Sequence, residues 1–239
     1  MNNKLPKLLI ALFVITIISC SNNGGEILPE QTKEKSSVID NYASIVYANY
    51  ADAISDAESL KASINTFITT PTDANFTAAK SAWLNARESY GQTEAFRFAS
   101  GPIDDTDGPE GLLNAWPLDE NYVDYVVGDD NSGIINNLVD YPTIDKSILE
   151  GLNEVGSETN ISVGYHAIEL LLWGQDTTAP SAKLAGQRPY TDFVDNGTAS
   201  NQSRRRNYLA ACADLLIDHL QLMINEWQVG GAYRTTFLA

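Results

Sequence analysis

Residues 73–98, DANFTAAKSAWLNARESYGQTEAFRF, decide the fold class because they have the pattern of one long helix. Pro71 ends the preceding segment, and Thr72 is a suitable N-cap. Bulky and charged side chains recur in alternating steps of four and three, which places them on one helix face: Trp83, Arg87, Tyr90, Glu94 and Arg97. This face is either a solvated edge with an ion pair between Glu94 and Arg97, or a buried polar site.

Other segments have the same helical periodicity and predict an all-α fold. Apolar residues recur at helical intervals over 38–67 and again over 200–228. Shorter helices are predicted near 120–127, 132–139 and 144–154, the last capped by Thr143, and another over 161–173, which Gly174 ends. No segment alternates strongly enough to predict a strand. We therefore expect an antiparallel helical bundle.

The composition sets limits on the partners. The 239 residues are 44% hydrophobic, which is enough to bury a core. The formal net charge is −16, and such a surface repels phosphate backbones. Nucleic acid is therefore excluded as an expected partner.

The first residues have the pattern of a bacterial lipoprotein signal. Two lysines precede an apolar run over 8–18, too short to span a bilayer, and the sequence Ile17-Ile18-Ser19-Cys20 follows. We expect 1–19 to be a signal peptide, Cys20 to carry the lipid that attaches the protein to the membrane, and 20–35 to be a flexible tether. An ordinary signal peptide is the alternative. The helical domain is expected over 36–239, truncated at its C-terminal end.

Residues 164–174, GYHAIELLLWG, contain the strongest candidate for a chemical site. His166 and Glu169 are three residues apart and share a helix face, so both can turn toward one cation. A core histidine bonded to Glu169 would have the same spacing, and the sequence leaves both interpretations open. One imidazole with carboxylates suits iron, manganese or zinc. The other histidine, His219, is expected on a helix surface, whereas zinc peptidase motifs need two neighbouring histidines.

Several segments, taken in order, resemble the imelysin family of lipoproteins. The resemblance covers 38–239 and rests on Trp83 to Arg87, YGQTEAFRF over 90–98, GPI over 101–103, NAWPLDE over 114–120, Asp124-Tyr125, GYHAIE over 164–169 and GQRPY over 186–190. The segment at 164–169 matches the GxHxxE signature of the family. Each segment alone is weak evidence, and their order makes the resemblance specific.

This resemblance implies two related helical bundles with a pocket between them, of which this chain contains the first. It makes His166, Glu169, Glu94 and Asp119 the expected metal ligands, with Arg97, Gly164, Tyr90, Trp116 and Arg188 around the pocket. It implies a metal cofactor, iron or else zinc, and a lipid-anchored protein of the outer membrane that works in iron uptake with envelope iron-transport proteins. A metallopeptidase and a non-catalytic surface interaction module are the alternatives.

Overall fold

The computed structural model describes residues 29–239, and every regular element in this range is a helix. Within these residues there is no strand, and one isolated bridge joins Val126 to Asp129. The prediction of an all-α fold is confirmed. The expected signal peptide, Cys20 and the first part of the tether lie outside the described residues.

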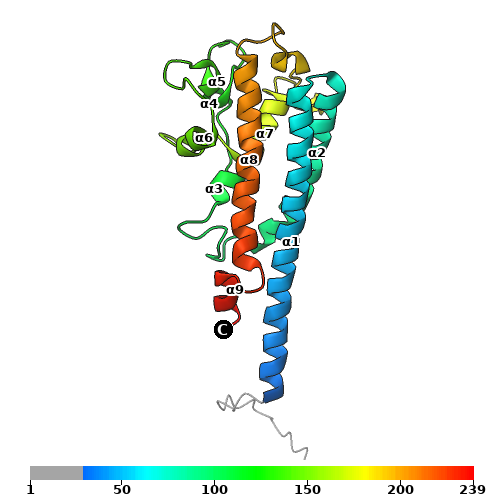
Figure 1. Cartoon of the computed structure of the whole chain (residues 1–239), viewed down its shortest axis with the longest axis vertical. Coiled ribbons are helices and arrows are strands. Elements are labelled where there is room, and N and C mark those ends of the chain that lie inside the picture. The colour runs from blue at the N-terminus through cyan, green and yellow to red at the C-terminus, as the bar shows by residue number, and fades with distance from the viewer. Residues whose placement is uncertain (1–28) are drawn as a thin grey trace, which may run out of the picture.

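Three long helices form the body of the molecule: α1 (Pro29–Thr69), α2 (Asp73–Thr93) and α8 (Gln202–Trp227). Figure 1 shows α1 running along the long axis, with α2 and α8 running back beside it. The buried positions of α1 alternate in steps of three and four, as packing of nearly parallel helices requires: Ala43, Val46, Tyr50, Ala53, Ala57, Leu60, Ile64 and Phe67. The Thr72 hydroxyl accepts from the Asn75 amide, as the capping prediction requires.

Shorter helices pack against this body. They are α3 (Glu110–Leu113), α4 (Glu120–Val123), α5 (Gly133–Asn136), α6 (Lys146–Leu152), α7 (Gly164–Trp173) and α9 (Ala232–Phe237), with 3₁₀ turns η1 (Glu94–Phe96), η2 (Pro180–Ala182) and η3 (Tyr190–Phe193). The helix α7 packs against both α2 and α8 and is buried along most of its length. Its burial gives the candidate site a rigid support.

The observed ends of some helices differ from the expected ones. The helix α1 begins at Pro29, so 29–35 are helical rather than part of a flexible tether, and proline suits the first turn of a helix. Val38 and Ile45, two residues of the apolar pattern over 38–67, are 69% and 46% exposed. Figure 1 shows that α2 ends before it reaches the first turns of α1, where Val38 lies, whereas Ile45 lies on the solvent side of α1 beside the buried Val46. The helix α6 is capped by Asp145 instead of Thr143.

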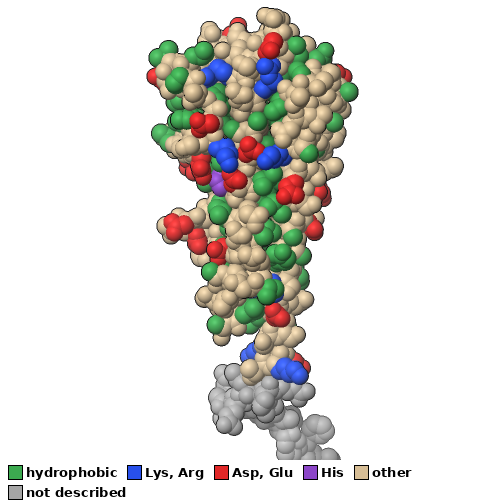
Figure 2. Space-filling view, in the orientation of Figure 1, with side chains coloured by type: hydrophobic (Ala, Val, Ile, Leu, Met, Phe, Trp, Pro, Cys, Tyr) green, Lys and Arg blue, Asp and Glu red, His purple; other side chains and the backbone are tan. Residues whose placement is uncertain are grey.

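The described surface is acidic without one dominant patch. Figure 2 shows acidic side chains scattered over several elements, with basic ones between them and no continuous basic area on the visible face. Among the described helices, none combines the length and the apolar character needed to cross a membrane. Burial raises the pKa of the Cys212 thiol, which makes it a packing residue rather than a nucleophile.

Candidate functional site

The candidate site begins where α7 starts, at a close contact between two backbones. Gly164 has φ +83°, and a Cβ there would lie 2.6 Å from the carbonyl oxygen of Leu113. Only glycine fits at this position, because it lets the start of α7 pass directly over the end of α3. The indole of Trp83 donates to the Tyr165 carbonyl over 2.9 Å and ties α7 to α2.

His166 and Glu169 contact each other, as their spacing predicts. The distance from His166 Nδ1 to Glu169 Oε2 is 2.8 Å. Within residues 29–239 the other ring nitrogen, Nε2, has no hydrogen-bond partner. The indole ring of Trp116 covers the imidazole, with ring centroids 4.7 Å apart. The carboxylate thus orients the ring and leaves Nε2 available to a ligand.

Two hollows meet at this histidine. The first, here called the aromatic hollow, has a volume of about 440 Å³ and is lined by Trp83, Leu84, Trp116, Leu118, Glu120, His166, Glu169, Leu170, Trp173, Gly174, Asp176, Ala185 and Gly186. The second, the polar hollow, measures about 410 Å³ and is lined by Arg97, Glu110, Asn114, Ala115, Trp116, Glu154 and His166. His166 and Trp116 belong to both.

The expected ion pair between Glu94 and Arg97 does not form. The chain tightens into η1 at Glu94 and is extended at Arg97, so the regular i,i+3 relation is lost. Arg97 pairs instead with Glu110 over 2.8 Å. Glu94 lies 3.7 Å from Arg87 and accepts from Asn114, and it reaches the polar hollow only through that asparagine.

Five of the predicted site residues line neither hollow: Glu94, Gly164, Tyr90, Asp119 and Arg188. The ring of Tyr90 is fully buried against Tyr165, with centroids 4.8 Å apart. Asp119 caps α4 and lines another hollow, beside asparagines. Arg188 is buried in an ion cluster. Spacing alone could not separate these residues from the site because their positions depend on contacts distant in sequence.

The ion cluster joins four buried charges. Asp124 accepts from Arg205 Nη2 over 2.8 Å and from Arg188 Nη1 over 2.6 Å, and Arg188 also lies 3.5 Å from Asp192. Burial opposes ionisation of Asp124, but Arg188 and Arg205 outweigh it and hold the pKa of this carboxyl below its usual value. The cluster is balanced in charge, and it ties α8 to the segments around 124 and 188.

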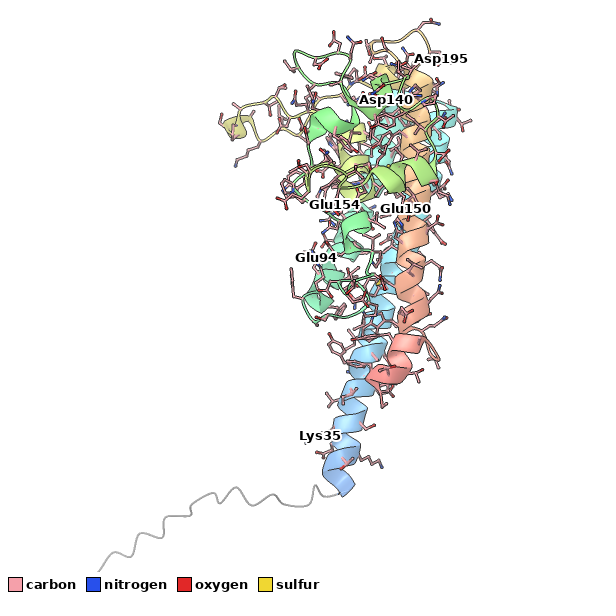
Figure 3. The ribbon with its side chains drawn as sticks, turned by 90° about the vertical axis from the view of Figure 1, so that its left-hand side faces the viewer. Lys35, Glu94, Asp140, Glu150, Glu154 and Asp195 are labelled. Atoms are coloured by element: carbon pink, nitrogen blue, oxygen red, sulfur yellow. The ribbon has the colours of Figure 1, made fainter. Side chains whose placement is uncertain are left out.

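The polar hollow contains residues that sequence reasoning missed. The sequence pattern assigns no site role to Glu110, Glu154 or Asn114. The structure brings all three toward His166. Figure 3 shows Glu154 and Glu94 on the same side of the molecule, with Glu94 nearer the end where α1 begins. Asn114 is the first residue of the segment NAWPLDE, and its place in that segment is the one sequence feature that points to the polar hollow.

The described residues offer an incomplete set of metal ligands. In 29–239 no three His, Cys, Asp or Glu side chains gather closely enough to hold a metal ion. The second histidine, His219, is 4% exposed rather than on the surface and contacts Glu150 over 3.0 Å. It lines neither hollow, so it does not complete a site with His166.

Comparisons with known proteins bear on the fold and the family of the chain. Over 75 residues the chain is 37% identical to iron-regulated protein A of Synechococcus elongatus. The aligned stretch covers 31% of this chain and 20% of that protein. A solved protein of Parabacteroides distasonis ATCC 8503, named as an iron-regulated protein A precursor, superposes with a TM-score of 0.62 at 18% identity. That match covers 86% of this chain and 50% of the solved one, so the chain spans about half the length of this relative.

The family model of imelysin, peptidase M75, matches residues 46–239, which include α2, α7, α8 and both hollows. The chain therefore belongs to the imelysin family.

Proposed function

We propose that this protein binds iron at His166, in the cell envelope, and takes part in iron uptake. The contact between Glu169 and His166 Nδ1 is the observation that supports this function most directly. A carboxylate on one ring nitrogen is the usual support of a metal-bound histidine, because it orients the ring and makes Nε2 a better donor. The names of both relatives, iron-regulated protein A, favour iron over zinc.

In this proposal the two motif residues have different roles. His166 provides the ligand atom Nε2, and Glu169 positions the ring without binding the metal itself. Iron needs more donors than one imidazole, so the others come with the iron or from residues outside those described. Glu154 lines the polar hollow without an ion-pair partner among the described residues, and it is the carboxylate best placed to assist.

We further propose that a lipid on Cys20 holds the protein at the outer membrane, where envelope iron-transport proteins are its partners. The lipoprotein pattern at 17–20 supports the anchor. A metallopeptidase gains no support from the described residues, because His219 contacts Glu150 and lies outside the hollows that include His166.

Calorimetric titration with ferrous iron under nitrogen, and with ferric citrate in air, tests the iron site. We expect saturable binding to the wild type and none to His166→Ala. Glu169→Gln is expected to bind about 10–100 times more weakly, because a supporting carboxylate is lost. Asp52→Asn, on the exposed side of α1, is the matched control and should bind as the wild type does.

Unchanged iron binding by His166→Ala would refute the assignment. A lower melting temperature in that variant, with no iron binding by the wild type, would instead favour the surface interaction module.

A further inference from the structure

The aromatic hollow has a composition that iron binding does not explain. Three of its walls are the indole rings of Trp83, Trp116 and Trp173. Trp83 and Trp173 meet edge to face with centroids 5.2 Å apart, and Trp83 is held by its bond to the Tyr165 carbonyl. Trp116 stands at the mouth and is 67% exposed. The rings form a prearranged apolar surface that ends in an open indole.

Apart from His166, the charged side chains that line the hollow are all acidic. The carboxylates of Glu120, Glu169 and Asp176 line the hollow, and no lysine or arginine of the described residues 29–239 does so. Hydrogen bonds from the Thr178 backbone and hydroxyl hold the pKa of Asp176 below its usual value, so this group remains ionised. The hollow is therefore electronegative as well as aromatic.

One side of the hollow is formed by a close crossing of two backbone segments at Gly186. A Cβ on Gly186 would lie 2.5 Å from the carbonyl oxygens of Trp173 and Gly174, so only glycine lets the two segments cross. The Arg188 amide donates to the Trp173 carbonyl over 2.9 Å and fixes the crossing. This crossing closes one side of the hollow with backbone.

We propose that the aromatic hollow binds a small organic cation, an ammonium group attached to an apolar body. The faces of indole rings attract cations, and this attraction is strongest where water is excluded. The three carboxylates add to it, while they repel an anion. A volume of about 440 Å³ lies within the range of sites for small molecules. Lys80, 5.4 Å from the Trp173 ring but outside the lining, shows that this indole already accepts a cation.

This site is distinct in chemistry from the proposed iron site, although His166 and Glu169 border both. The cation is recognised by rings and by charge, and needs no open coordination position. The two proposals can therefore fail separately. An apolar peptide or an uncharged iron chelate would use the rings but not the carboxylates.

Three probes with one phenethyl body and different charges test the proposal: 2-phenylethylamine, 2-phenylethanol and 3-phenylpropionate. Each is titrated into the protein in EDTA, and dissociation constants are measured by ligand-observed NMR and tryptophan fluorescence. We expect the amine to bind at least about tenfold more tightly than the alcohol, and the carboxylate to be weakest. Equal affinity for amine and alcohol, tighter binding of the carboxylate, or no binding of any probe overturns the proposal.

Two variants locate the site. Trp116→Leu and Glu120→Gln should each weaken amine binding roughly fivefold, and Glu120→Gln should leave the affinity for the alcohol unchanged. Phe98→Leu, an exposed ring that lines neither hollow, and Asp130→Asn, an exposed acid, are the controls. If neither Trp116→Leu nor Glu120→Gln changed the affinity for the amine, the cation would bind elsewhere and the assignment would be refuted.

His166→Ala separates this proposal from iron binding. It removes the proposed iron ligand but leaves the three tryptophans and the carboxylates of Glu120, Glu169 and Asp176 in place. We expect it to keep the preference for the amine over the alcohol. Loss of that preference would show that the hollow does not recognise cations as described.

Discussion

Asp124→Ala is expected to lower the free energy of unfolding by about 3–5 kcal/mol, because it breaks a buried ion cluster from one side. The side chains of Arg205 and Arg188 are 0% and 1% exposed, and both depend on this carboxylate. Without it, two buried guanidinium groups face Asp192 alone. The measurement is urea unfolding followed by circular dichroism, with the slope compared between variants.

An exposed ion pair provides the control for this prediction. Asp195 lies 2.8 Å from Arg206, and its side chain is 73% exposed. Asp195→Ala should therefore cost less than about 1 kcal/mol. If Asp124→Ala were no more destabilising than this control, the cluster would not hold α8 to the segments around 124 and 188.

Gly164→Ala is expected to destabilise the protein by about 2–5 kcal/mol and to displace His166. The positive φ angle costs a residue with a Cβ about 1–3 kcal/mol, and overlap with the Leu113 backbone adds a similar amount. Thermal unfolding measures the loss. Iron titration of the folded variant tests the displacement of His166, and we expect weaker binding than that of the wild type.

Gly91→Ala is the matched control for the glycine of the motif. Gly91 lies within α2, and nothing is within 4 Å of the position of a Cβ there. Alanine in a helix is favoured over glycine by up to about 1 kcal/mol, so this variant should be slightly more stable. Equal stability of the two variants would contradict the role that the backbone contact gives to Gly164.

The long helices could be predicted because each has a periodic pattern over many turns. The helices α1, α2 and α8 are found where the apolar spacing places them, and Gly174 ends α7 as predicted. The short helices α4 and α5 are smaller than expected, since a few residues in a loop contain little periodicity. The exposed start of α1 could not be predicted, because its burial depends on where α2 ends.

Within the candidate site, only contacts between residues close in sequence could be predicted. The contact between His166 and Glu169 follows from their spacing within one helix. The partners of Arg97 and Arg188 come from segments far away in sequence, Glu110 and Asp124, and their pairing depends on the folding of the loops. Opposite charges in a sequence do not show which pairs will meet.

His166 and Trp116 form a wall common to both hollows, so two ligands bound there, as proposed, would be coupled. A ligand that turns either ring from one side changes the space and the atoms offered on the other. Linkage then requires that each ligand alter the affinity of the other by the same factor. If both binding proposals hold, binding of one ligand would change how tightly the other is retained, and release of the two would be linked.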